Sequence, residues 1–124
     1  MIIKYSRNGE IEWAKGIGGD DSDYINSVAE CSDGGYIVGG YFNSSSIDLG
    51  NGVSLTRGDN SAAMLIKYDK KGEVEWAKGL ANAQINTVAE TNNGDYIVGG
   101  SYNHKKDLGN GVTLPDTFSS PAML

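Results

Sequence analysis

Two short segments of this sequence carry carboxylate and amide side chains at the same spacing. The segment D-L-G-N-G occurs at residues 48–52 and again at residues 107–111. Carboxylate and amide oxygens can bind Ca²⁺ or another ligand in a loop. The same pattern is typical of tight turns, because Asn-Gly accepts positive φ and Asp bonds to nearby backbone N–H groups. We favour the turn, and keep as candidate binding residues Asp48, Asn51, Asp107 and Asn110.

Side chains suited to catalysis are scarce. His104 is the sole histidine and lies in a polar segment, and Cys31 has no basic residue beside it in the sequence. A polar segment favours a solvated imidazole over a general base, and a thiol distant from cations is an inert one. We therefore expect no enzyme activity and no catalytic residue.

An acidic cluster is the other group that could hold a metal. Asp20, Asp21 and Asp23 could offer oxygens to Ca²⁺. The corresponding part of the second half of the chain, residues 80–84, is three residues shorter and contains no acid. A solvated turn is the favoured interpretation, and we predict no metal site and no cofactor.

Length and charge narrow the classes of partner. The chain has 124 residues, which suits one domain, and ten Lys and Arg face sixteen Asp and Glu, for a net charge of −6. A nucleic-acid surface needs clustered cations, and a membrane span needs about 20 consecutive apolar residues. Neither feature occurs in the sequence. We expect no nucleic-acid partner and no insertion into a membrane.

The sequence consists of two tandem repeats within a single domain, residues 1–124. Repeat 1 covers about 1–63 and repeat 2 about 64–122, and a third repeat begins at residues 123–124. In the three aligned blocks, 30 of 44 residues are identical. Two similar segments of about 60 residues in tandem are the sequence signature of a repeat architecture. The fold of one repeat is therefore considered before the role of any single residue.

Each repeat has the pattern of short strands separated by turn residues. Met1–Tyr5 and Glu10–Lys15 flank an Asn-Gly turn, and Ile25–Glu30 and Tyr36–Phe42 flank Ser-Asp-Gly-Gly. Trp13 alternates with glutamates on its predicted strand, which favours packing over a sugar-stacking role. The pattern predicts an all-β chain, and a period near 60 with four main strands is typical of β-propeller blades.

Four sequence patterns carry a family resemblance. They are K-Y-x-x-x-G-x-x-x-W-A-K-G, S/T-V-A-E, G-x-Y-I-V-G-G and D-L-G-N-G-V, and each occurs in both repeats. Together they resemble the bacterial SBBP-type β-propeller repeats of surface and secreted proteins. The resemblance implies a scaffold, a secreted or cell-surface location and no catalytic residues.

In propellers of this kind the chain divides its strands unequally among blades. Met1–Lys15 supplies the two outer strands of one blade, Ile25–Lys78 a whole blade, and Ile85–Asn103 the two inner strands of the next. Two blade equivalents do not close a ring, and closed propellers have about 4–8 blades. We predict a cyclic homo-oligomer of roughly two to four copies, with three or four favoured. The alternative is an excerpt from a longer propeller chain.

We therefore expect a non-enzymatic binding or scaffold module that presents repeated loops to a glycan or surface ligand. The alternative is a purely structural repeat with no ligand of its own. Glu30 and Glu90 end the predicted innermost strands, so they are further candidate residues, at one mouth of a central channel.

Overall fold

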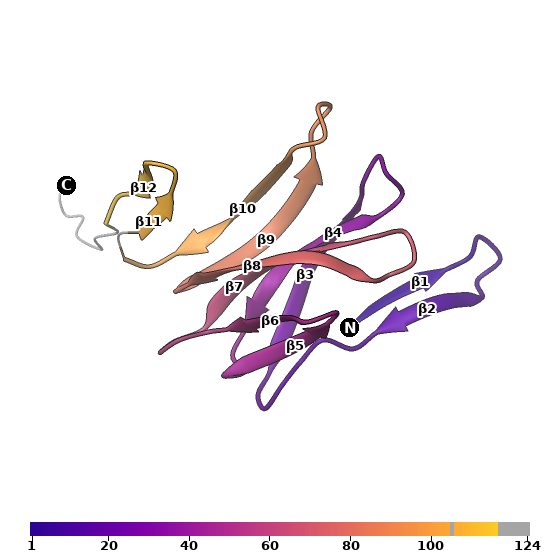
Figure 1. Ribbon diagram of the computed structural model, residues 1–124, viewed down its shortest axis with the longest axis horizontal. Coiled ribbons are helices and arrows are strands. Elements are labelled where there is room, and N and C mark those ends of the chain that lie inside the picture. The colour runs from indigo at the N-terminus through magenta and orange to yellow at the C-terminus, as the bar shows by residue number, and fades with distance from the viewer. Residues whose placement is uncertain (105, 117–124) are drawn as a thin grey trace.

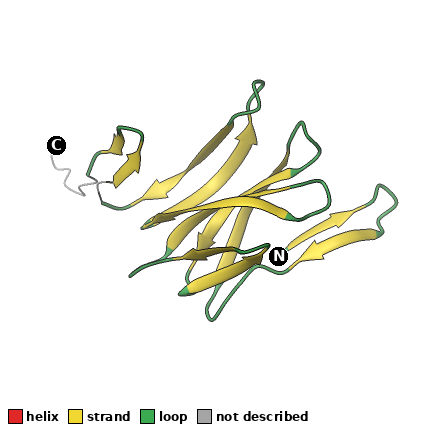
Figure 2. Ribbon diagram, viewed as in Figure 1, coloured by secondary structure: helices red, strands yellow, loops and turns green. Residues whose placement is uncertain are grey.

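The computed structural model describes residues 1–104 and 106–116 of the chain. All the regular secondary structure in this range is β-strand, and turns and loops join the strands (Figure 2). The predicted all-β class is therefore confirmed. The predicted start of a third repeat at residues 123–124 lies outside the described residues.

The largest sheet has four antiparallel strands in the order β3-β4-β7-β8 (Figure 1). Their bounds are β3 (Asp23–Glu30), β4 (Tyr36–Phe42), β7 (Ala62–Tyr68) and β8 (Val74–Ala81). Burial is nearly continuous along β4 and β7, the two central strands, as expected for strands covered on both faces. The sequence predicts one complete four-stranded blade between Ile25 and Lys78. The observed sheet matches this blade, but it begins two residues earlier, at Asp23, and ends three residues later, at Ala81.

A two-stranded ribbon lies on each side of this sheet (Figure 1). One ribbon pairs β1 (Ile2–Tyr5) with β2 (Ile11–Lys15), and the other pairs β9 (Ala83–Glu90) with β10 (Tyr96–Tyr102). The β9–β10 register repeats that of β3–β4, including a bulge one residue after Ile25 and Ile85. The repeated sequence therefore folds into the same local structure twice.

The connection between β8 and β9 is tighter than the sequence predicted. The predicted strands stop at Lys78 and resume at Ile85, whereas the observed strands are separated by Asn82 alone. Asn82 has a φ of 55°, a left-handed conformation that asparagine adopts more readily than most residues. A single residue therefore turns the chain from one sheet to the next.

Two small hairpins complete the described fold. They pair β5 (Ser46–Gly50) with β6 (Val53–Thr56), and β11 (Lys106–Gly109) with β12 (Val112–Leu114). In both hairpins the three turn residues have positive φ, at residues 50–52 and 109–111. The small hairpin predicted in the long connection of repeat 1 is thus present, and it recurs in repeat 2.

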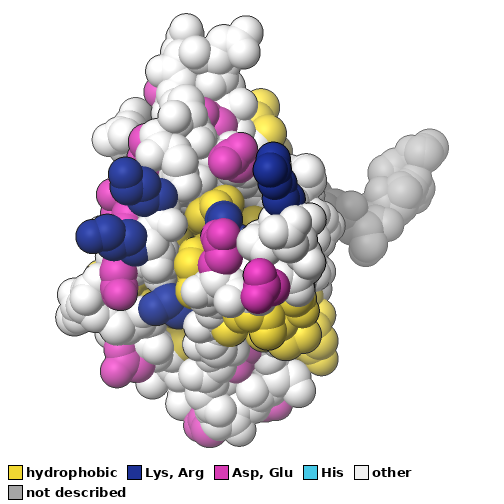
Figure 3. Space-filling model, turned by 90° about the vertical axis from the view of Figure 1, so that its right-hand side faces the viewer, with side chains coloured by type: hydrophobic (Ala, Val, Ile, Leu, Met, Phe, Trp, Pro, Cys, Tyr) yellow, Lys and Arg dark blue, Asp and Glu magenta, His cyan; other side chains and the backbone are white. Residues whose placement is uncertain are grey.

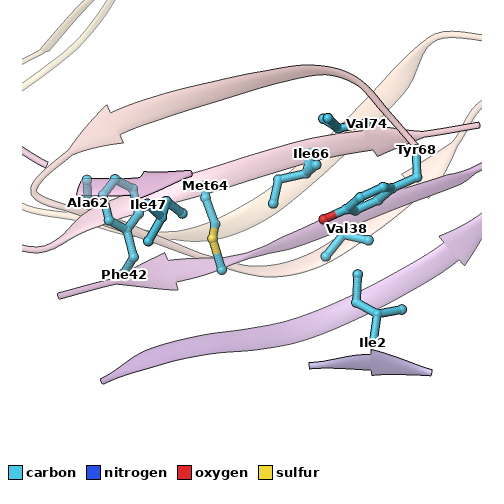
Figure 4. Packing of buried hydrophobic residues seen from close by; sticks show 9 residues of the cluster. All are labelled: Ile2, Val38, Phe42, Ile47, Ala62, Met64, Ile66, Tyr68 and Val74. Carbon is cyan, nitrogen blue, oxygen red and sulfur yellow. The ribbon is translucent and has the colours of Figure 1, made fainter. Parts of the chain in front are cut away.

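The hydrophobic core lies between the sheets. One buried cluster joins Ile2 of β1 to the face of the four-stranded sheet that carries Val38, Met64 and Ile66 (Figure 4). A second cluster joins the opposite face, through Ile37 and Ala63, to β9. A Cβ atom added at Gly39 would lie 2.4 Å from the Ile85 Cγ2 atom, so a glycine is required where these two layers meet.

Candidate functional site

The hairpin that contains Asp48 and Asn51 uses both side chains to build its turn. The Gly50 N–H donates to Asp48 Oδ1 at 2.9 Å, and Asn51 has a φ of 54°. Asn51 Nδ2 also donates to the Val74 carbonyl oxygen at 3.2 Å, which ties the hairpin to β8. One Asp48 oxygen and the Asn51 amide are therefore already engaged within the chain.

The matching hairpin in repeat 2 has the same geometry. The Gly109 N–H donates to Asp107 Oδ1 at 2.9 Å, and Asn110 has a φ of 53°. Figure 1 shows the two hairpins far apart on the molecule. No group of three or more His, Cys, Asp or Glu side chains that could hold a metal occurs among the described residues. The structure thus shows two equivalent turns and does not combine them into one site.

Glu30 and Glu90 have different surroundings. Glu90 Oε1 accepts a hydrogen bond of 2.7 Å from the Ser32 N–H, so this side chain links β9 to the turn after β3. Glu30 occupies the equivalent place at the end of β3 and is exposed. The link made by Glu90 joins neighbouring sheets, a role that sequence reasoning missed because it depends on a contact across 58 residues.

The acidic cluster of repeat 1 binds its own loop. Asp23 Oδ2 accepts from the Ser44 hydroxyl at 2.7 Å and from the Gly19 N–H at 3.1 Å. Asp20 accepts from both the backbone N–H and the hydroxyl of Ser45, each at 3.0 Å, and these bonds lower the pKa of Asp20. The cluster thus fastens the segment before β3 to the segment after β4.

A buried lysine is the main polar feature that sequence reasoning missed. Lys67 Nζ lies 3.0 Å from Asp33 Oδ2 and 2.8 Å from Glu75 Oε1, and it donates to the Tyr68 carbonyl oxygen. Burial opposes the charge, but the bonds to Glu75 and Asp33 outweigh it and raise the pKa of Lys67. The bond from the Gly35 N–H, followed by that from Lys67, lowers the pKa of Asp33. The sequence signal that could have revealed this buried ion pair is a lysine within the otherwise apolar strand A-A-M-L-I-K-Y.

The two side chains weighed for catalysis lie in separate places. Cys31 is buried, and its burial raises the pKa of the thiol, which keeps it protonated at neutral pH. His104 has a φ of 72° and lines a polar cavity of about 390 Å³. The cavity is lined by hydroxyl and amide side chains from the end of β10, from Asn82 and from Asn60. Cys31 and His104 therefore do not belong to one site.

The most distinctive surface is the pair of sheet edges at the ends of the chain. Ile37 and Val38 of β4 are both 0% exposed, whereas their repeat equivalents on β10, Ile97 and Val98, are 62% and 42% exposed. Ile37 is covered by the following sheet through β9, and Val38 packs with Met64 and Ile66 of β7. Among the described residues, β10 pairs only with β9 and has neither a following sheet nor a strand in the place of β7. An unpaired edge with exposed apolar side chains is a template for another strand.

The first two strands of the chain, β1 and β2, also have apolar side chains that are exposed where their repeat equivalents are buried. Tyr68 of β7 and Val74 of β8 are buried, whereas their equivalents Tyr5 and Ile11 are exposed. Figure 3, which views the side of the molecule that carries β1 and β2, shows hydrophobic side chains at the surface among charged ones. The β1–β2 ribbon thus lacks inner strands, and the β9–β10 ribbon lacks outer ones.

The described residues include no helix long and apolar enough to cross a membrane. In comparisons with known proteins, the chain is similar to an uncharacterized WD repeat-containing protein of Acanthamoeba polyphaga mimivirus, with 34% identity over 110 residues. No protein-family model and no solved structure matches it. The chain resembles a stretch of a WD-repeat β-propeller.

The similarity covers 82% of this chain and 8% of the mimivirus protein. Together with the antiparallel sheets, it supports a WD repeat-like β-propeller fold for the repeats. The SBBP-type family stays a prediction, since no family model matches the chain.

Proposed function

We propose that this chain is a non-enzymatic β-propeller module that closes a ring with copies of itself and presents its repeated loops for recognition. The observation that carries the proposal is the contrast between the buried Ile37 and Val38 and the exposed Ile97 and Val98. The same strand sequence is buried on β4, where β7 pairs with it and β9 of the following sheet covers it, and is exposed on β10. Outer strands without inner partners stand at β1 and β2, which pair only with each other.

Each copy contributes two blade equivalents, so a ring of copies has an even number of blades. Closed propellers have about 4–8 blades, which corresponds to roughly two to four copies, and we favour three or four. Each copy adds the same two hairpins at residues 46–56 and 106–114. A ligand with repeated groups, such as a glycan or a surface polymer, is bound more tightly by many identical loops than by one. A secreted or cell-surface location follows if the SBBP-type resemblance holds.

The second candidate is a purely structural repeat of a longer propeller chain. The observation that favours it is the relative itself, because the chain spans only 8% of its length. In that case the strands that complete β9–β10 come from the following repeat of the same polypeptide, and the loops have no ligand of their own.

Amide hydrogen exchange tests the closure of the ring. In the ring, the amides on the free edge of β10 are hydrogen-bonded, and their exchange is slow at high protein concentration and faster on dilution. Fast exchange of β10 at every concentration, with slow exchange of β4, contradicts the ring. A glycan array with the assembled protein then separates binding from a structural role: specific binding supports the module, and none supports the structural repeat.

A further inference from the structure

We propose that the acceptor for β10 is β1 of a second copy, joined in one defined register, with β2 of that copy as the outermost strand. This inference rests on the proposed ring of copies and adds the interface to it. The template is the β4–β7 pairing inside the chain, where Val38 lies opposite Ile66 and Gly40 opposite Met64. Each β10 residue is numbered 60 above its β4 equivalent, and each β1 residue 63 below its β7 equivalent. The same register therefore pairs β10 with β1 of the second copy as Ile97↔Lys4, Val98↔Ile3, Gly99↔Ile2 and Gly100↔Met1.

An apolar cavity marks the place that the added strand fills. It has a volume of about 420 Å³ and runs along β10. Its apolar lining comes from the ends of β8 and β9, from β10 and from the β11–β12 hairpin: Leu80, Ile85, Val98, Tyr102, Leu108 and Leu114. The equivalent space in repeat 1 is part of the first hydrophobic cluster.

Two side chains from β7 occupy that space in repeat 1. Met64 and Ile66 are each 0% exposed and lie in the cluster with Val38 (Figure 4). Their equivalents on β1 are Met1 and Ile3, and Met1 is 81% exposed. In the proposed register, Met1 and Ile3 of the second copy enter the cavity beside Val98. The apolar lining of the cavity therefore matches the apolar side chains of Met1 and Ile3.

A second set of contacts connects β9 to β3 of the same second copy. Inside the chain, Asn26 Nδ2 donates to the Ile85 carbonyl oxygen at 2.9 Å, and the Val88 N–H donates to Ser27 Oγ at 3.2 Å. The equivalent donors and acceptors at the interface are Asn86 to the Ile25 carbonyl oxygen and the Val28 N–H to Thr87 Oγ1. All four of these groups exist in the sequence, so the hydrogen bonds can be repeated without substitution.

The exposure of Val28 and the position of Glu30 are both consistent with this contact between β9 and β3 of the second copy. Val28 is 47% exposed, whereas its equivalent Val88, already covered by the neighbouring sheet, is 6% exposed. Glu30 of the second copy would accept from the Asn92 N–H, as Glu90 accepts from the Ser32 N–H within the chain. The interface thus gives Glu30 the role that Glu90 already has.

One departure from the template makes the interface weaker than the internal pairing. Asp95 stands where β4 is preceded by Gly35, and a Cβ atom at Gly35 would lie 2.2 Å from the Tyr68 carbonyl oxygen. The added strand must therefore splay apart near Tyr5. Asn93 also replaces the carboxylate of Asp33, so Lys4 of the second copy keeps its ion pair with Glu12 of its own ribbon but lacks the counterpart of the Lys67–Asp33 pair.

Disulfide trapping between two separately purified variants tests the register. Val98→Cys and Ile3→Cys are each made in a Cys31→Ser background, mixed and oxidised, so that a mixed disulfide can form only between copies. Residues opposite each other on one face of a sheet bring their Cβ atoms close enough for a disulfide, and neighbours on the other face do not. We expect efficient crosslinking of this pair, and about tenfold less for the control pair of Val98→Cys with Lys4→Cys.

The native mass of each mixture distinguishes the two proposals. An assembly that crosslinks the control pair as efficiently, or neither pair, overturns the register and leaves the ring standing. A folded monomer with no crosslink overturns both. Asp95→Gly gives an independent readout: removing the Cβ clash should tighten the association, and weaker association would contradict the proposed fit.

Discussion

Trp76 packs edge-on against Tyr96, with ring centroids 5.9 Å apart and ring planes at 62°. The two residues lie on β8 and β10, which belong to different sheets. Trp13 and Tyr36 repeat the contact between β2 and β4, at 5.7 Å and 64°. Each indole therefore touches the tyrosine of the following sheet, and the contact recurs where one sheet stacks on the next.

The Trp76–Tyr96 contact should contribute to stability beyond its buried area. We expect a double-mutant cycle of Trp76→Leu and Tyr96→Leu, measured by urea unfolding, to give a coupling energy of about 0.5–1.5 kcal/mol. The cycle of Trp13→Leu and Tyr36→Leu is the matched control and should give a similar value. Additive effects in both cycles would show that the aromatic contact has no part in stacking the sheets.

Gly39 and Gly99 should respond differently to the same substitution. Gly39→Ala places a methyl group 2.4 Å from Ile85 Cγ2, an overpacking that we expect to cost about 1–3 kcal/mol of folding free energy. At Gly99 the nearest heavy atom is Thr87 Cγ2 at 3.1 Å, so the folded chain should tolerate Gly99→Ala better.

The second effect of Gly99→Ala should be on association, because in the proposed ring Ile25 and Val28 of the next copy lie over Gly99. Unfolding at low concentration reports the stability of the chain, and sedimentation at high concentration reports the assembly. A Gly99→Ala variant that assembles like the unmodified chain would contradict the contact.

Acid should weaken the ion pairs of Lys67. The pKa of Asp33 lies below its ordinary value of 3.8 in the folded chain, so its contribution is present above that value. Stability from this group is lost as the pH falls through the lowered pKa. The melting temperature of Asp33→Asn should therefore fall less between pH 7 and pH 3 than that of the unmodified chain. Equal falls in both proteins would remove Asp33 from the acid response.

Ca²⁺ should leave the melting temperature unchanged. Asp48 and Asp107 each bond to a backbone N–H within their own turn, and no described cluster of acids joins them. A ligand that binds only the folded chain raises its stability, so a rise at millimolar Ca²⁺ that EDTA reverses would establish a site. Asp48→Asn is the control, and it should have the same effect on melting with and without Ca²⁺.

Local patterns predicted much of this fold. Asn51 and Asn110 marked turns, because asparagine before glycine favours positive φ, and the alternation around Trp13 marked a strand. The repeat itself predicted that β9–β10 would copy β3–β4. These features depend on residues close together in the chain, where the physical preferences of each residue are sufficient.

The contacts between sheets could not be predicted in the same way. The bond from Ser32 to Glu90 and the ion pair of Lys67 with Asp33 join residues far apart in sequence. Nothing in the local sequence of Glu90 separates a side chain that links two sheets from one that lines a channel. These contacts depend on how neighbouring sheets and strands pack in three dimensions, which the local sequence does not specify.

The native mass of the purified chain tests the central proposal most directly. We expect a single species by native mass spectrometry at a small multiple of 13.1 kDa, roughly two to four copies and even in blade number. Dilution should dissociate it, because the Asp95 end of the joined strands fits less closely than the internal pairing. A folded monomer at high concentration, with β10 still unpaired, would contradict the ring.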